Sequence, residues 1–378
     1  MTEYVTWLQS FSFRQSKLNL LLIFLPLSVY FEYQHNLSLA FFCSLIAIMP
    51  LAFLMGRATE EIALRTSESV GGLLNATFGN AAEMIIAIFA IIAASNADLA
   101  TPEGILTQST MINLVQASLI GSILGNLLLI MGLSFVWGGI HHSEQTFSTN
   151  ASRSNGSLLL LSMLVLIVPS VYSYSVEGER GIDGLSNLSH IASLILISIY
   201  FLFLLFQLKT HVHLFATEGA HFEESEMSQR DSIILLILST VLVSWMAHIL
   251  VHSVEVAADE FDLPYLFIGV ILLPFFGNAA EHFTAVVVAG KNKMELSFAI
   301  SMGSSTQIAV FVAPFMVLIS WFLNVPLTFE FGLLETISVF LSVLIVNSIA
   351  EDGRSNWLEG AMLLGAYTIL GAAFLFYH

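Results

Sequence analysis

The pentapeptide GNAAE occurs twice in this chain, at Gly79–Glu83 and again at Gly277–Glu281, 198 residues apart. Each copy lies inside a long apolar run, where glycine weakens a helix and a carboxylate is costly to bury. Asn80 and Glu83 are three residues apart, so they share one face of a helix, and the second copy repeats this spacing. The repetition therefore predicts a pair of polar sites placed inside apolar helices.

The composition places the whole chain in a membrane. Of its 378 residues, 56% are hydrophobic and 10% are charged, and the mean hydropathy is +0.84. Such values lie far outside the range of water-soluble domains. The single cysteine, Cys43, excludes a disulfide framework and a cysteine-based metal cluster, and a net charge of −17 argues against nucleic-acid binding. We therefore expect an all-α polytopic membrane protein without a cofactor.

The apolar runs predict eleven transmembrane helices joined by short connections. The predicted spans are 18–35, 38–57, 72–95, 105–138, 156–175, 188–208, 232–256, 264–289, 294–322, 328–348 and 356–377. With these spans, ten of the eleven Lys and Arg residues fall on the side of the N-terminus, and only Arg180 falls on the other side. The positive-inside rule then predicts a cytoplasmic N-terminus and a C-terminus outside.

The two GNAAE copies lie in spans that cross the membrane in opposite directions. In each case the next span carries a Gly-Ser pair, Gly121-Ser122 in the first half and Gly303-Ser304 in the second. This predicts two inverted five-helix repeats preceded by one extra helix, an arrangement typical of transporters. The predicted parts are an N-terminal segment and extra helix (1–36), the first repeat (37–208), an acidic cytoplasmic linker (209–231) and the second repeat (232–378).

The residue types in the paired motif favour a divalent cation as the ligand. Glu83 and Glu281 are both predicted near the middle of the bilayer, and helix breaks at Gly79 and Gly277 would expose backbone carbonyl oxygens there. Carboxylate, amide and carbonyl oxygens are the ligands that Ca²⁺ prefers. Two ionised carboxylates without a cation would repel each other, so we expect protons and Ca²⁺ to compete for them.

Neighbouring spans carry further polar residues. The fourth span contains Gln116, and the ninth contains Gln307. A row of small residues at Ala117, Gly121 and Gly125 predicts close packing of the fourth span against a partner helix.

Four stretches of the sequence resemble the calcium/proton exchangers, the CAX branch of the calcium:cation antiporter superfamily. The stretches are ATEEIALRTSESVGGLLNATFGNAAEMIIAIFA (58–90), LIGSILGNLLLIMG (119–132), PFFGNAAEHFTAV (274–286) and MGSSTQIA (302–309). The resemblance implies eleven helices, two glutamates that bind both the cation and protons, and second and seventh helices that move to open the site. The ion-site residues that it implies are Glu83 and Glu281. It also implies supporting oxygens or hydrogen-bonding partners at Asn80, Asn278, Gln116 and Gln307, and His282 matches the histidine that follows the family's second motif.

Three other polar groups have two interpretations each. His248, His252, Glu255 and Asp259 form a stripe on the seventh helix, which fits a transition-metal site or, preferably, a polar face of the outer access path. Glu60 and Glu61 fit either the cytoplasmic mouth of the transporter or a solvated helix face. The acidic stretch 217–230 fits a solvated linker or a regulatory, calcium-sensing helix.

Together these features predict a secondary antiporter, not an enzyme, that exchanges Ca²⁺ for H⁺ by alternating access in a lipid bilayer. The main alternative is an exchanger coupled to Na⁺, or one for Mn²⁺ or another divalent cation. A non-transporting membrane enzyme or assembly subunit would need a nucleophile or metal triad, for which only the stripe around His252 is a candidate. We expect a bacterial inner membrane, with an acidic-organelle membrane as the alternative; a homo-oligomer is compatible with the sequence.

Overall fold

A computed structural model describes residues 5–66, 71, 74, 77–176, 179–212 and 225–377 of the chain. These residues are almost entirely helical, which confirms the all-α prediction. Within the described part, the one sheet pairs β1 (Gln145–Thr146) with β2 (Arg354–Ser355) antiparallel. The described chain divides into two compact units, and each is described separately below.

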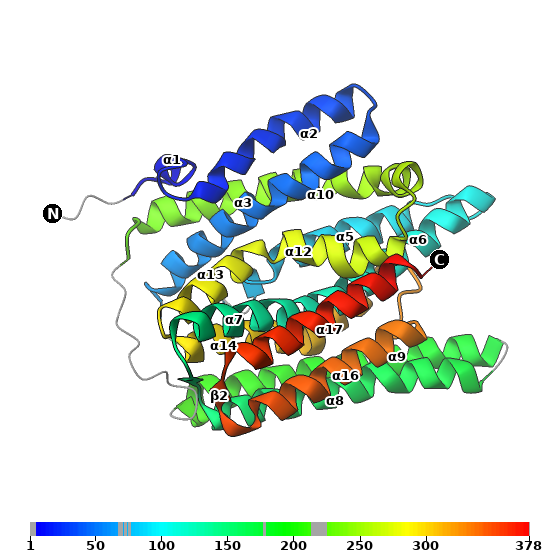
Figure 1. The fold of residues 1–378 in the computed structure, drawn as a ribbon. Coiled ribbons are helices and arrows are strands. Elements are labelled where there is room, and N and C mark those ends of the chain that lie inside the picture. The colour runs from blue at the N-terminus through cyan, green and yellow to red at the C-terminus, as the bar shows by residue number, and fades with distance from the viewer. Residues whose placement is uncertain are drawn as a thin grey trace. The chain divides into compact units, whose positions relative to one another are not determined.

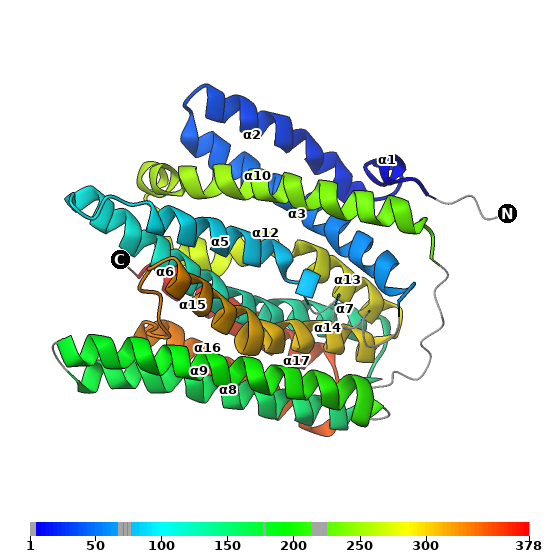
Figure 2. The same cartoon turned by 180° about the vertical axis from the view of Figure 1, so that it is seen from behind.

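Unit 1 comprises Met1–Phe89, Glu218–Leu263 and Phe275–Glu281. Its helices are α1 (Trp7–Ser10), the 3₁₀ helix η1 (Lys17–Ile23), α2 (Phe24–Tyr33), α3 (Leu37–Ala63) and α10 (Gln229–Phe261). Helix α3 lies along α10, and α2 packs on α3, as both faces of the molecule show (Figures 1 and 2).

The sequence explains where the two long helices of unit 1 begin. The side chains of Asn36 and Ser228 accept hydrogen bonds from backbone N–H groups in the first turns of α3 and α10, respectively. Such N-caps satisfy donors that would otherwise lack a partner. The two helices pack along each other, and two-thirds of the apolar window of α3 is buried.

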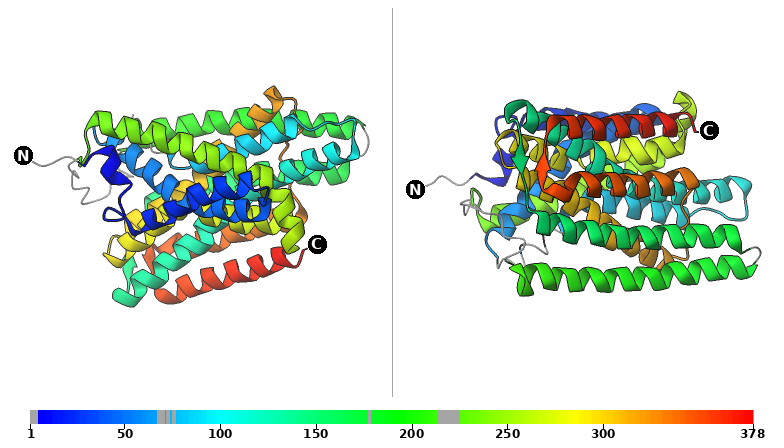
Figure 3. Two further views of the ribbon diagram at one scale, coloured as in Figure 1. Left: turned by 90° about the horizontal axis from the view of Figure 1, so that it is seen from above. Right: turned by 60° about the horizontal axis from the view of Figure 1, so that its bottom comes forward.

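Unit 2 comprises Ala90–Thr217, Pro264–Pro274 and His282–His378. Its first half contains α6 (Pro102–Leu124), the π-helical turn η2 (Gly125–Ile130), α7 (Met131–His141), α8 (Thr149–Ser175), α9 (Glu179–Leu205) and the π turn η3 (Phe206–Thr210). Its second half contains α11 (Tyr265–Phe267), the π turn η5 (Ile268–Leu272), α14 (Met294–Gln307), the π turn η6 (Ile308–Val312), α15 (Ala313–Phe322), α16 (Leu333–Ile349), the 3₁₀ turn η7 (Ala350–Asp352) and α17 (Trp357–Leu375). Helix α8 packs against α9 and α16, and α17 packs against α7 (Figure 3).

Three further helices cross the boundaries between the units along the chain. These are α5 (Ala81–Ser95), α12 (Leu273–Gly277) and α13 (Ala279–Gly290). Each of them begins or ends next to a GNAAE motif, so the chain breaks its helices where the motifs occur.

Eight helices of the described chain are long and apolar enough to span a membrane, and a broken helix pair, Tyr265–Gly277 with Glu281–Gly290, makes up to nine. Two of the eleven predicted spans are not counted, because their described helices are too short to cross a membrane. The first is divided into η1 and the ten-residue α2, and the described apolar helix of the third is the fifteen-residue α5. The multi-pass membrane fold is thus established, while the number eleven remains a prediction.

Close packing inside unit 2 confirms two members of the predicted row of small residues, Ala117 and Gly121, whereas a Cβ atom on Gly125, the first residue of η2, would meet only Cβ of Pro274, at 4.0 Å. A Cβ atom on Gly121 would lie 2.2 Å from the backbone oxygen of Val270, and a Cβ atom on Gly269 would lie 2.4 Å from Cβ of Ala117. The partner of the row is therefore the π turn η5. Two backbones can approach this closely only where side chains are absent or small.

Candidate cation site

The first GNAAE motif forms a turn followed at once by a helix. Gly79 and Asn80 lie in the turn, and α5 begins at Ala81, so Glu83 lies in the first turn of the helix. Asn80 is fully buried and Glu83 is 9% exposed. A helix N-terminus favours a carboxylate because its unpaired N–H groups and its dipole are positive. The local structure therefore places a buried carboxylate at the positive end of α5.

The second motif repeats this arrangement at a helix break. Helix α12 ends at Gly277, α13 begins at Ala279, and the helices on either side of the break differ in direction by 60°. Asn278 is 2% exposed and Glu281 lies in the first turn of α13, half-buried. The two copies thus share one design, in which an asparagine precedes a helix and a glutamate occupies its third position.

The two motifs meet within unit 1. A Cβ atom on Gly277 would lie 3.5 Å from Oε1 of Glu83, so the first carboxylate faces the backbone of the second motif. Glu83 is also close enough to Glu281 for their charges to repel. No described residue gives either oxygen of Glu83 a hydrogen bond. A buried, unbonded carboxylate beside a second carboxylate is unstable as an ion unless a cation or a proton neutralises it.

The two glutamines of the predicted ion site lie in unit 2, and they differ from each other. Gln116 is 8% exposed, and its Nε2 donates to the backbone oxygens of Thr328 (3.0 Å) and Glu330 (2.9 Å). Gln307 is the last residue of α14 and lines a cavity of about 160 Å³ together with Thr306 and Glu295. The amide nitrogen of Gln116 therefore holds a connecting segment in place, and the sequence did not suggest residues 328–330 as its partner.

The π turns were not predicted. In the fourth span, η2 begins four residues after Gly121; in the ninth, η6 begins five residues after Gly303. Asn126 within η2 is fully buried, and neither polar atom of its side chain has a hydrogen-bond partner among the described residues. Such turns occur often at functional sites. Asn126 itself was visible in the sequence, as an asparagine between a glycine and four consecutive aliphatic residues.

The polar stripe on α10 is largely exposed. His248 and His252 are exposed, Glu255 is half-buried, and the two imidazole rings are stacked 6.5 Å apart. No group of three or more His, Cys, Asp or Glu side chains among the described residues could hold a metal ion. His248 instead lies 5.8 Å from the ring of Phe89 on α5. These positions give the transition-metal interpretation no support, and the access-path role, which the sequence favours, stays a prediction.

Three further predicted residues have contrasting environments. Glu60 is exposed, whereas Glu61 is 6% exposed, which rules out a solvated face for Glu61. His282, the fourth residue of α13, is half-buried.

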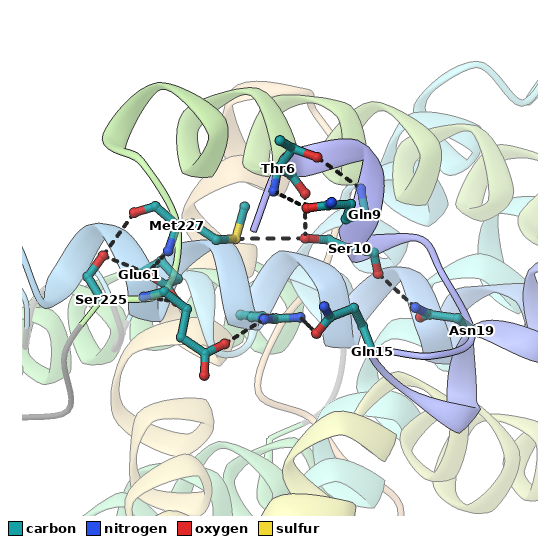
Figure 4. A network of polar contacts seen from close by, with 10 residues as sticks. Thr6, Gln9, Ser10, Gln15, Asn19, Glu61, Ser225 and Met227 are labelled. Carbon is teal, nitrogen blue, oxygen red and sulfur yellow. Dashed lines mark hydrogen bonds and ion pairs between the residues drawn. The ribbon is translucent and has the colours of Figure 1, made fainter. Parts of the chain in front are cut away.

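Glu61 is held by the described end of the acidic linker (Figure 4). Its carboxylate accepts hydrogen bonds from Ser225 Oγ (2.9 Å), the Glu226 backbone N (3.2 Å) and the Met227 backbone N (3.1 Å). Arg57 forms an ion pair with Glu226 at 2.9 Å, and Arg65 donates to Ser225 Oγ at 2.6 Å. We call this group, residues 57–65 at and just after the end of α3 together with residues 225–227, the clasp. Of the predicted linker 209–231, residues 213–224 lie outside the described residues.

The comparisons with known proteins agree with this architecture. The family model described as sodium/calcium exchanger protein matches residues 36–209 and 231–376, one match in each predicted half. The chain belongs to this family. It is similar to a Ca(2+)/H(+) antiporter of Aphanothece halophytica, at 40% identity over 94% of this chain and 95% of that protein. It is also similar to the Ca(2+)/H(+) antiporter ChaA of Bacillus subtilis, at 39% identity over 92% of this chain and 95% of that protein.

Two solved structures share the fold of this chain. The structure of native YfkE superposes with a TM-score of 0.78 at 36% identity, covering 95% of this chain and 99% of that one. A structure entitled H+/Ca2+ exchanger CAX gives a TM-score of 0.66 at 13% identity, over 97% of this chain and 93% of that one, which shows a common fold. The chain is therefore an integral multi-pass membrane protein of a transporter family.

Proposed function

We propose that this protein is a secondary antiporter that exchanges Ca²⁺ for H⁺, with Glu83 and Glu281 as the groups for which both ions compete. The observation that carries the proposal is the meeting of the two motifs in unit 1, where the buried Glu83 carboxylate faces Gly277 and repels Glu281. The names of the similar proteins above support Ca²⁺ and H⁺ as the exchanged ions.

The chemistry of exchange follows from charge. With Ca²⁺ absent, the pair is stabilised when protons neutralise it, because two desolvated carboxylates repel strongly. When Ca²⁺ arrives, its two positive charges take over this role and the protons leave. Asn80 and Asn278, which are both buried beside their glutamates, offer amide oxygens, and the breaks at Gly79 and Gly277 offer backbone carbonyls. Coordination by several oxygens of irregular geometry suits Ca²⁺ better than Mg²⁺.

Movement of α3 and α10 would open the site alternately to the two sides. These helices correspond to the predicted second and seventh spans, and they pack along each other within unit 1. We further propose that the N-terminus is cytoplasmic, that the C-terminus is outside and that the protein acts in a bacterial inner membrane, expelling Ca²⁺ as protons enter.

The test is Ca²⁺ uptake by proteoliposomes under an imposed pH difference. A proton gradient should drive uptake of radioactive Ca²⁺, and an equal Na⁺ gradient at constant pH should not. Uptake driven by Na⁺ alone would replace the proposal with the Na⁺-coupled alternative, and uptake of Mn²⁺ in preference to Ca²⁺ would reassign the substrate. Absence of any gradient-driven cation flux from well-folded protein would contradict the exchanger function itself.

A further inference from the structure

Unit 2 contains a cavity of about 480 Å³ that lies apart from the two GNAAE motifs along the chain and includes Gln116 in its wall. It is bounded by α6, by the beginning of α11 at Tyr265, and by residues 326–332 before α16, and it reaches Tyr377. The volume is within the range of small-molecule and ion-binding pockets. All of the elements that line it come from the side that the charge distribution predicts to be outside.

Oxygen atoms are available in this cavity. The Gln116 side chain, held by its Nε2, has an Oε1 atom that accepts no hydrogen bond from a described residue and is not sealed from solvent. Glu335 is 7% exposed; one carboxylate oxygen accepts from Gly332 N at 2.7 Å, and the other receives no bond from a described residue. The side chains of Gln116 and Glu335 are thus held in position and more than nine-tenths buried. Each keeps one oxygen that can still accept a hydrogen bond or bind a cation from the cavity.

The cavity selects for positive charge. Glu330 also lines it, together with Asn113 and Thr328, and none of its lining residues is Lys, Arg or His. Two carboxylates without a basic neighbour create a negative potential that concentrates cations. Since no group of three or more acidic, histidine or cysteine side chains forms among the described residues, a bound metal ion would keep part of its hydration shell.

We propose that this cavity binds a partly hydrated divalent cation, with Glu335, Glu330 and the amide oxygen of Gln116 as its protein ligands. The proposal rests on the function proposed above, because it assigns the cavity a step in that function. Ions would be held here on the outer side, in exchange with solvent, before or after they occupy the glutamate pair. Low affinity for the cation suits this role, because a bound ion must also be able to leave the cavity.

A protonated organic amine is the competing occupant. Tyr265 and Tyr377 contribute aromatic surface to the wall, and such surface attracts alkylammonium groups. The fixed oxygens of Gln116 and Glu335 favour the metal ion, because they would lie in its coordination sphere. Both occupants are compared in the experiment below.

Terbium binding to the purified protein provides the direct test. Tb³⁺ replaces Ca²⁺ at oxygen sites and luminesces when nearby tyrosines are excited. The measurement uses full-length Glu83→Gln/Glu281→Gln protein, so that the glutamate pair does not contribute. We expect saturable luminescence that Ca²⁺ displaces, that weakens when Tyr265→Phe and Tyr377→Phe are added, and that shows on the order of ten-fold lower affinity with Glu330→Gln/Glu335→Gln.

The variants are chosen so that the fold is kept. A glutamine at 335 retains an oxygen for Gly332 N, and Glu330 is exposed. Glu103→Gln, an exposed carboxylate in the first turn of α6, is the matched control and should leave Tb³⁺ affinity unchanged. Equal affinity with and without Glu330→Gln/Glu335→Gln, or displacement by spermine but not by Ca²⁺ or Mg²⁺, would overturn the proposal.

Transport measurements separate this inference from the exchanger function. With the glutamate pair intact, Glu330→Gln/Glu335→Gln should raise the Ca²⁺ concentration needed for half-maximal exchange on the cavity side several-fold and leave the opposite side unchanged. Unaltered values on both sides together with normal exchange would refute the cavity site and leave the antiporter standing. Terbium binding at the cavity in a protein that shows no exchange would support the cavity site and refute the antiporter function.

Discussion

The two halves of this chain share a backbone plan and differ in what surrounds it. Both GNAAE motifs place a glutamate third in a helix after a break, and both Gly-Ser pairs precede a π turn. Yet a Cβ atom on Gly121 would collide with Val270, whereas a Cβ atom on Gly303 would meet nothing within 4 Å. The repeated sequence motifs therefore form the same helix breaks and π turns in both halves, but the residues packed around Gly121 and Gly303 differ.

This comparison predicts which positions are functionally equivalent. Where both copies serve one ion, as proposed for the glutamates, changes in either half should have the same effect. Where the copies serve packing, changes should have different effects in the two halves. The four predictions below test this distinction, beginning with the largest effect.

Neutralising either glutamate should abolish exchange to the same extent. Glu83→Gln and Glu281→Gln should both reduce pH-driven Ca²⁺ uptake to the level of protein-free vesicles, because each removes one of two charges that the cation needs. Glu359→Gln is the matched control, since Glu359 is also third in its helix, α17, but accepts a hydrogen bond from Asn356 N as a helix cap. Full activity in one of the two motif variants would show that the halves are not equivalent at the site.

The Gly-Ser pairs should respond unequally to an added methyl group. Gly121→Ala puts a Cβ atom 2.2 Å from the backbone oxygen of Val270, which cannot move unless η5 moves with it. We therefore expect the free energy of unfolding to fall by about 1–3 kcal/mol. Gly303→Ala should be neutral or should stabilise α14 by up to about 1 kcal/mol, because alanine is the better helix former. Thermal unfolding in detergent measures both, and equal melting temperatures for the two variants would contradict the packing difference.

Much of this arrangement could be predicted from the sequence. Apolar runs located the long helices, the repeated pentapeptide located the paired glutamates, and the spacing of Ala117 and Gly121 identified a close-packed face. These features depend on residue type and on short-range periodicity, which a single sequence displays. The break between Gly277 and Ala279 also agrees with the expectation that glycine frees the backbone there.

Other features depend on contacts between distant residues and could not be predicted. The role of Gln116 requires knowing that residues 328–330 lie beside α6, and the burial of Glu61 requires residues 225–227 to fold back on α3. The π turns have no composition of their own, because their extra residue is accommodated by packing. Asn126 shows the limit clearly: its polarity was visible, but its complete burial was not.

Removing the Gln116 side chain should destabilise the protein as well as affect transport. In Gln116→Ala, the backbone oxygens of Thr328 and Glu330 lose their donor, and a cost of about 1–3 kcal/mol is expected for the buried groups. Ser118→Ala, which removes only a local bond to Val115 O, is the control and should cost less than half as much. Unchanged thermal stability in Gln116→Ala would contradict the supporting role of the Gln116 amide nitrogen for residues 328–330, and a loss of transport would then have to come from its amide oxygen.

The smallest expected effect compares the two ends of the α3–α10 pair. At one end Glu61 accepts three hydrogen bonds from residues 225–227, and at the other Ser38 donates a single bond to Glu260. Glu61→Ala should leave the Glu226 and Met227 amides without acceptors, and hydrogen exchange at those two amides should become at least ten-fold faster, equivalent to about 1.4 kcal/mol of lost protection.

Ser38→Ala should cost about 1 kcal/mol or less, because it removes one bond at an end of α3 that Asn36 still caps. Hydrogen exchange at the Glu226 and Met227 amides should be unaffected by this change, as it should be by Lys17→Gln, an exposed substitution at the first residue of η1. If Ser38→Ala accelerated exchange at those amides as much as Glu61→Ala does, α3 and residues 225–227 would open together as one cooperative unit. The clasp would then owe its protection to the whole helix pair, and Glu61 would have no local role in fixing the linker.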